Sequence, residues 1–129
     1  MKRKLCLMIV LLAAVAPGPA KAATSDGAWI SKVPERARER LNPFNADADA
    51  SQAGAKLYQR NCASCHGSDA EGRGTHPALR SGRVHDATDG ELEWLLRNGS
   101  MRRGMPSWSR LPEAERWQLV RYLRTLPLN

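Results

Sequence analysis

The chain has 129 residues, with 20 Lys or Arg against 13 Asp or Glu and a formal net charge of +7. This length suits one small domain and is too short for two. Four basic residues lie in the first 21 positions, and without them the net charge is +3. The modest charge of the remainder argues against nucleic-acid binding.

Residues 1–22 have the parts of a secretory signal peptide. Three basic residues precede an apolar run over 5–16, prolines follow, and Ala20-Lys21-Ala22 matches a small-x-small cleavage site. The run is too short to span a bilayer, so an uncleaved anchor is the weaker alternative. We therefore expect a periplasmic protein that has no transmembrane anchor after cleavage and that has lost Cys6.

Residues 23–50 are polar and contain two prolines, but they also carry scattered apolar side chains. We interpret them as an arm on the surface of the following domain, with a short helix over 34–40. The alternative is a disordered leader.

Residues 51–129 are expected to form one all-α domain. The pattern predicts a helix over 51–61 and a glycine-rich loop over 66–87. A second helix begins at Thr88 with a capping box through Glu91 and ends near Asn98-Gly99. A second loop covers 100–111, and Pro112 takes the first position of the last helix, where Ser109 is the candidate cap. No stretch alternates like a strand.

The run Cys62-Ala63-Ser64-Cys65-His66 carries the chemistry. Two thiols at this spacing can add across the two vinyl groups of a haem, and the adjacent histidine then supplies an axial nitrogen. A thioredoxin-like pair would need a βαβ pattern, and a zinc site would need a second pair of ligands. A structural disulfide between such close cysteines would close almost no loop. Haem attachment is therefore the preferred interpretation.

Two methionines of the exported chain are candidates for the sixth iron ligand. Met105 lies between Gly104, which we expect to allow a close backbone approach, and Pro106, which stiffens the loop. Met101 is followed by two arginines, a poor setting for a buried thioether. We prefer Met105 over Met101. His76 and His85 are minor alternatives as the sixth ligand. Either methionine could instead be a core residue that only fills space.

Over about residues 51–126 the chain resembles the small class I c-type cytochromes. The resemblance implies a cytochrome c fold with three to four helices around one covalent haem c. It also implies His66 as the proximal and Met105 as the distal ligand. It rests on Cys62–Gly67, Pro77-Ala78-Leu79, Gly104-Met105-Pro106 and a closing helix with Trp117, Leu119 and Tyr122.

The resemblance also assigns supporting contacts. The Pro77 carbonyl would accept a hydrogen bond from the His66 ring. Gly54 and Tyr58 of the first long helix would meet Leu119 and Tyr122 of the last. One departure is His76, which stands where the family often has glycine and makes the local geometry of that loop uncertain.

Five further side chains are candidates near the haem edge. The Trp108 indole can bond a propionate, with a core aromatic as the alternative. Arg80 and Arg83 can pair with a propionate, although solvation is the simpler expectation. Arg102 and Arg103 flank Met105, and we hypothesise that they dock an acidic partner.

These residues predict an electron carrier, not an enzyme, that exchanges single electrons with redox proteins such as a periplasmic dehydrogenase, oxidase or reductase. One alternative is a haem protein with an open sixth position, such as a gas sensor or peroxidase. Another is the cytochrome subunit of a larger dehydrogenase complex, docked through residues 23–50. The identity of the partner, the reduction potential and the oligomeric state do not follow from the sequence.

Overall fold

The structure is a computed structural model that describes residues 28–129. The expected signal peptide and the first residues of the expected arm therefore lie outside the described residues. In the described part, helices account for all regular structure and the only bridges are two isolated ones, Arg73–His76 and Ser100–Met105. None of its helices combines the length and the apolar character needed to cross a membrane.

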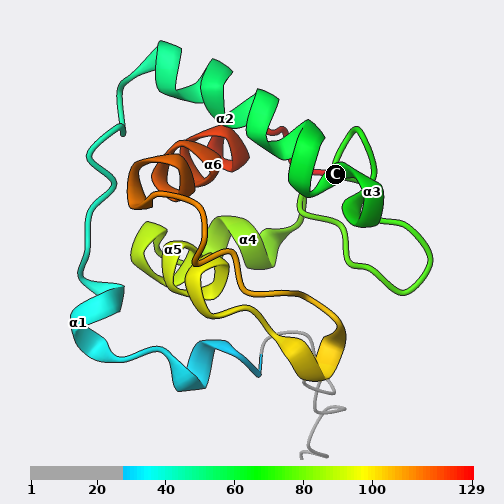
Figure 1. The fold of residues 1–129 in the computed structure, drawn as a ribbon, viewed down its shortest axis with the longest axis horizontal. Coiled ribbons are helices and arrows are strands. Elements are labelled where there is room, and N and C mark those ends of the chain that lie inside the picture. The colour runs from blue at the N-terminus through cyan, green and yellow to red at the C-terminus, as the bar shows by residue number, and fades with distance from the viewer. Residues whose placement is uncertain (1–27) are drawn as a thin grey trace, which may run out of the picture.

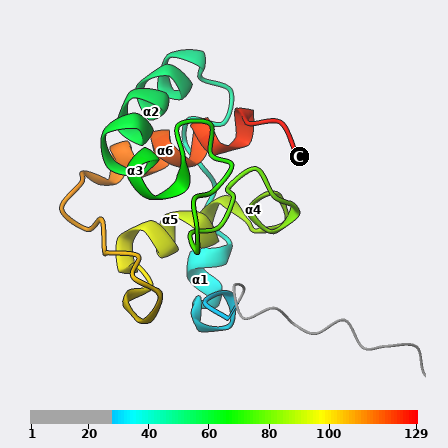
Figure 2. The same ribbon diagram turned by 90° about the vertical axis from the view of Figure 1, so that its right-hand side faces the viewer.

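The helices form two groups. Helices α2 and α6 cross on one side of the molecule, and α4, α5 and α1 lie on the other (Figures 1 and 2). The elements are η2 (Ile30–Lys32), α1 (Glu35–Arg38), α2 (Ala48–Asn61), α3 (Ala63–His66), α4 (Gly82–Asp86), α5 (Asp89–Asn98), η3 (Met101–Arg103) and α6 (Glu113–Thr125). The three longest are those predicted, and the prediction of an all-α domain is confirmed for the described residues.

Local signals explain where these helices begin. Asp47 caps α2 by accepting a hydrogen bond from the Ala50 amide, which starts this helix three residues before the expected position. The predicted capping box of α5 is present, because Thr88 and Glu91 bond each other's backbone amides. Gly99 ends α5 as its C-cap.

Four local predictions were wrong. The loop over 66–87 contains α4, and the loop over 100–111 contains η3, because single turns leave no periodic signal. Pro112 has extended geometry (ψ 148°) and is the N-cap of α6, not its first residue. Ser109 does not cap this helix; its amide bonds the Ser107 hydroxyl instead.

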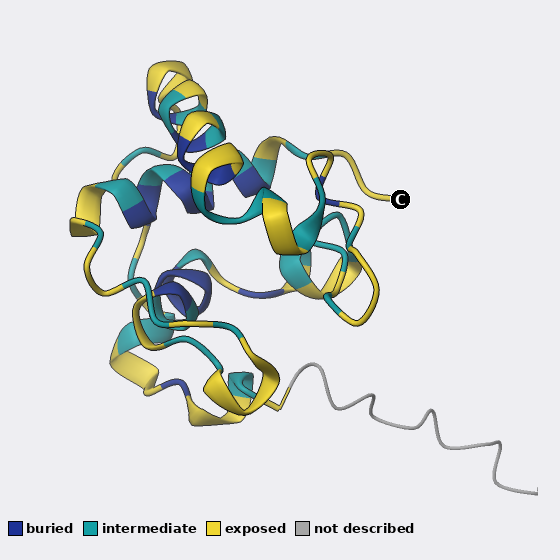
Figure 3. Cartoon of the chain, turned by 45° about the vertical axis from the view of Figure 1, so that its right-hand side comes forward, coloured by how far each residue is buried: buried dark blue, intermediate teal, exposed yellow. Residues whose placement is uncertain are grey.

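The core lies where α2 and α6 cross, and buried positions gather there and on α5 (Figure 3). A Cβ on Gly54 would lie 2.0 Å from the Gln118 carbonyl oxygen and 2.8 Å from Tyr122 Cβ, so only glycine permits this crossing. The rings of Tyr58 and Tyr122 pack with centroids 5.3 Å apart. The expected meeting of the two helices is confirmed, with Gln118 and Tyr122 as the contacts of Gly54.

Residues 28–50 pack on α5 and α6 in the manner of the predicted arm. Arg38 forms an ion pair with the buried Glu91 (2.6 Å), and Arg40 pairs with Glu113. The buried Asn42 amide donates to the Trp117 carbonyl (3.0 Å). These inward contacts make the arm part of the folded unit.

Candidate functional site

The two cysteines lie on one helical turn at the end of α2. The amide of Cys62 still bonds the Tyr58 carbonyl of α2, and its carbonyl accepts from the His66 amide (2.9 Å) across α3. Both thiols are free; Cys65 is exposed and Cys62 is half-buried. Residues three apart on a helix share a face, so the two sulfurs are presented together.

Burial raises the pKa of the Cys62 thiol to about 11, and the neighbouring Cys65 adds to this shift. The thiol is therefore protonated near neutral pH and is a weak nucleophile in disulfide exchange. Two free thiols suit the addition of S–H across a carbon–carbon double bond, which needs no oxidant.

The His66 imidazole is oriented by a backbone group. Its Nδ1 donates to the Pro77 carbonyl oxygen over 2.9 Å, the contact that the resemblance implied. Because a carbonyl only accepts, Nδ1 carries a proton, and in the neutral ring the lone pair is then on Nε2. A histidine held in this way has one ring nitrogen ready for a metal.

The loop that carries Pro77 is tied back to α3. The Gly72 amide donates to the His66 carbonyl (2.8 Å), and the Leu79 amide donates to the Ala70 carbonyl (2.9 Å). Gly72 has φ +86°, and a Cβ there would lie 2.8 Å from the His76 carbonyl oxygen. This winding brings Pro77 to the histidine ring.

Tyr58 fastens the same loop to α2, a role that sequence reasoning missed. Its side chain is fully buried, and its hydroxyl donates to the Gly67 carbonyl (2.7 Å). Burial, more than the nearby Cys62, raises the pKa of Tyr58 far above its usual value, so the hydroxyl remains a donor. The sequence placed Tyr58 only on the helix-packing face.

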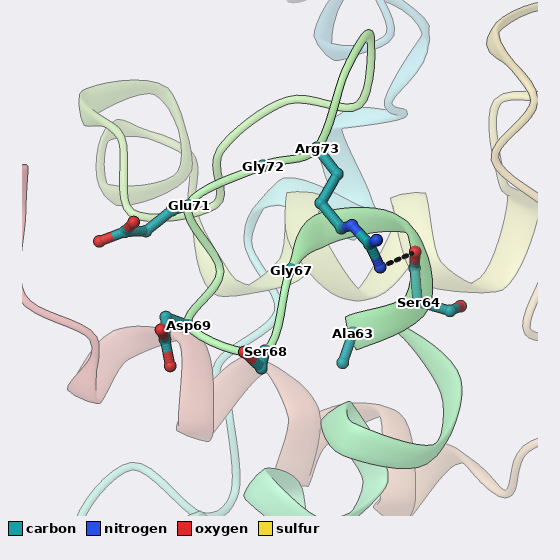
Figure 4. A pocket seen from close by; sticks show the side chains of 8 residues that line it. All are labelled: Ala63, Ser64, Gly67, Ser68, Asp69, Glu71, Gly72 and Arg73. Carbon is teal, nitrogen blue, oxygen red and sulfur yellow. Dashed lines mark hydrogen bonds between the residues drawn. The ribbon is translucent and has the colours of Figure 1, made fainter.

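Arg73 and Arg124 are also stabilising residues with no sequence signal. Both bond backbone carbonyls elsewhere in the chain, and Arg124 also pairs with the Asp89 carboxylate (2.7 Å). The Arg73 guanidinium donates to the Ser64 carbonyl (3.2 Å) across a shallow hollow beside α3 (Figure 4). The hollow is lined by Ala63, Ser64 and residues 67–69 and 71–73, and its lining does not include Cys62, Cys65 or His66. Arg124 donates to the carbonyls of Val84 (2.8 Å) and His85 (3.1 Å) and so fixes α4.

The two methionine candidates differ in burial. Met105 is half-buried against the core, whereas Met101 is 72% exposed. Gly104 has φ +76° and open space around an added Cβ. The expectation of a close backbone approach at Gly104 is therefore wrong. Glycine is favoured at this position because the backbone takes a left-handed turn after η3.

The two histidine alternatives are poorly placed for a sixth ligand. The His76 ring lies beside that of His66, with centroids 6.3 Å apart, and so on the proximal side. The Nε2 of His85 is buried by protein atoms and has no hydrogen-bond partner in the described chain. A nitrogen enclosed in this way does not face an open ligand site.

The remaining candidates have mixed outcomes. Trp108 is half-buried on the core, with the Arg110 guanidinium 4.6 Å from its ring centroid. Arg80 is engaged within the protein, because it donates to the Pro127 carbonyl (3.1 Å) and to Glu71 (3.0 Å); the expectation of a solvated side chain was wrong. Arg83, Arg102 and Arg103 are exposed.

These residues fit a covalently attached haem. Two free thiols share a turn with an imidazole that has one available nitrogen, and the thioether of Met105 is half-buried. Apolar side chains from the loop after Pro77, from α4 and from the segment after η3 are packed on the core yet partly exposed, which suits contact with a flat apolar group; they include Leu79, Val84, Met105 and Trp108.

Comparisons with known proteins agree with this geometry. Residues 49–123 match the family described as cytochrome c oxidase, cbb3-type, subunit III. The chain is 34% identical over 95 residues to the cbb3-type cytochrome c oxidase subunit CcoP of Azospirillum brasilense, covering 67% of this chain and 32% of that protein. The chain thus spans about a third of the length of the curated relative that it matches.

A solved structure is similar as well. The crystal structure of cytochrome cL from the marine methylotroph Methylophaga aminisulfidivorans matches with a TM-score of 0.58 and 29% sequence identity, covering 66% of this chain and 58% of the other. The matched family region contains the Cys62–His66 turn and Met105. The chain therefore belongs to the family of cbb3-type cytochrome c oxidase subunit III domains, and its expected cytochrome c fold is confirmed.

Proposed function

We propose that this chain is a periplasmic electron carrier with one covalently attached haem c, ligated by His66 and Met105. The observation that carries the proposal is the hydrogen bond from His66 Nδ1 to the Pro77 carbonyl, which leaves Nε2 for iron. The haem iron supplies one-electron chemistry when bound. The single Cys-x-x-Cys-His run in the chain supports one haem.

The protein's own residues hold and orient the group. Cys62 and Cys65 provide the two thioether positions, the loop over 67–79 fixes the proximal imidazole, and Met105 offers a sulfur on the distal side. Methionine opposite histidine favours a high reduction potential. The proposal of a periplasmic location is supported by the pattern of residues 1–22.

The test is an absorption spectrum of the ferric holoprotein. We expect a low-spin haem with a sulfur-to-iron band that is absent in Met105→Ala and retained in the control Met101→Ala, because Met101 is exposed. A high-spin ferric haem in the unaltered protein, with a ferrous form that binds carbon monoxide readily, would instead support a sensor or a peroxidase.

A second candidate is an electron-transfer subunit of a larger complex. It is favoured by the relative whose name describes an oxidase subunit. The arm over 28–50 is not well suited to bind a partner, because its side chains Arg38, Arg40 and Asn42 already contact α5 and α6. Deleting the arm and measuring co-purification from native periplasm tests the docking role, and full co-purification would contradict it.

The exposed Arg102 and Arg103 keep their proposed role in docking an acidic partner. Reversing both charges should weaken the salt dependence of electron transfer. An unchanged salt dependence would remove these residues from the docking surface.

A further inference from the structure

The last turn of α5 is completed by the segment that carries Met105. A helix leaves the carbonyls of its final turn without partners inside the helix. Here the Trp108 amide donates to the Leu96 carbonyl (2.8 Å), and the Ser107 hydroxyl donates to the Arg97 carbonyl (2.6 Å). The chain just after Met105 therefore supplies two of the missing partners.

Gly99 lies at the contact between these two stretches of chain. Its φ is +69°, and a Cβ on it would lie 2.6 Å from the Pro106 carbonyl carbon and 2.6 Å from the Ser107 nitrogen. Both are backbone atoms, which cannot swing aside as the end of a side chain can. Only glycine lets the end of α5 touch the backbone behind Met105.

The intervening turn closes on itself. The Ser100 amide donates to the Met105 carbonyl (2.8 Å), and the Met105 amide donates to the Ser100 carbonyl (3.2 Å). Met105 is thus bonded to the residue after Gly99 and joined covalently to the residue that Gly99 contacts. A displacement at Gly99 reaches Met105 from both sides.

We propose that Gly99 and Ser107 are positioning residues that hold Met105 on the distal side of the haem site. The inference rests on the proposed function, in which Met105 is the distal ligand. Gly99 allows the contact and the Ser107 hydroxyl fastens it. Together these two residues set the fraction of molecules in which the Met105 sulfur occupies the ligand position.

The experiment uses the full-length holoprotein and two readouts, the ferric sulfur-to-iron band and the affinity of the ferrous form for carbon monoxide. Carbon monoxide binds only when the sulfur is displaced, so its apparent affinity reports the open fraction. Gly99→Ala should weaken the band and raise that affinity by about ten-fold, which corresponds to ~1.4 kcal/mol of lost stability in the closed loop.

Gly104→Ala is the matched control for Gly99→Ala. Gly104 has a similar φ of +76° and directly precedes Met105, but an added Cβ there meets no atom within 4 Å. Both variants carry the strain of a left-handed alanine, so Gly104→Ala should weaken the band and raise the carbon monoxide affinity by less than Gly99→Ala does. The proposal is overturned if Gly99→Ala binds carbon monoxide like the unaltered protein, or if Gly104→Ala loses the band to the same degree.

Ser107 provides a second test that does not depend on Gly99→Ala folding. Ser107→Ala should raise the carbon monoxide affinity in the same direction but by less, and Ser107→Thr, which keeps a hydroxyl, should restore it. Equal affinities in both Ser107 variants and the unaltered protein would contradict the role of Ser107. Absence of the band from the unaltered protein would overturn the proposed ligation and this inference together, whereas an unchanged carbon monoxide affinity in Gly99→Ala would overturn the inference alone.

Discussion

Two segments flank the proposed haem site, and they are held in different ways. The proximal segment over 62–79 is fastened to α2 through Tyr58, to α3 through Arg73 and to itself through Gly72 and Leu79. The distal segment over 99–108 is fastened to the last turn of α5 by two hydrogen bonds, from the Trp108 amide and the Ser107 hydroxyl. Anchors shared by one helix end are lost together, so the distal side should open first.

The largest effect is expected from Gly72→Ala in the proximal segment. The variant combines a left-handed backbone with a Cβ only 2.8 Å from the His76 carbonyl oxygen. We expect a loss of about 3 kcal/mol in the free energy of unfolding, from left-handed strain and overpacking together. Guanidinium unfolding of the holoprotein measures it.

Gly74→Ala is the control for this variant, because Gly74 also has a positive φ (+56°) but no atom within 4 Å of an added Cβ. It should lose only about 1 kcal/mol, the cost of strain alone. Equal losses in the two variants would show that the winding around Pro77 is looser than the structure has it.

A guanidinium titration of the unaltered protein should separate the two segments. We expect the sulfur-to-iron band to disappear at a lower denaturant concentration than the far-UV helix signal. The free energy of distal opening should be smaller than that of global unfolding by about 2 kcal/mol, as is typical of a loop with few anchors. Coincident transitions would mean that both segments open only when the whole domain unfolds.

The contrast between the segments also explains what the sequence could predict. Cys62, Cys65, His66 and the box between Thr88 and Glu91 were identified because their spacing is local. Met105 was preferred over Met101 from its immediate neighbours, and the difference in burial agrees with that preference. Whether either sulfur binds iron stays a prediction.

The contacts that fasten the two segments were not predictable in the same way. Gly99 was noted only as a helix end, since the backbone that it touches is seven to eight residues away in a loop without periodicity. Arg80 was expected in solvent because the sequence does not show that Glu71 and Pro127 lie beside it in the fold. The single-turn helices α4 and η3 depend on such contacts and left no pattern.

The smallest expected effects come from a pair of variants that removes one side-chain anchor from each segment. Tyr58→Phe deletes the hydroxyl that bonds the Gly67 carbonyl (2.7 Å), and Ser107→Ala deletes the one that bonds the Arg97 carbonyl (2.6 Å). Each loses one hydrogen bond to a carbonyl, which should lower the free energy of unfolding by about 1 kcal/mol. Ser107→Ala also loses the bond that its hydroxyl accepts from the Ser109 amide (3.2 Å), so its loss should be the larger of the two.

The two variants should also differ in how they bind carbon monoxide. Ser107→Ala weakens the base of the loop that carries Met105, whereas Tyr58→Phe leaves three of the proximal contacts intact: Gly72–His66, Leu79–Ala70 and Arg73–Ser64. Only Ser107→Ala should therefore raise the carbon monoxide affinity. If Tyr58→Phe raised it equally, both segments would belong to one cooperative unit, and the separate anchoring of the distal side would be wrong.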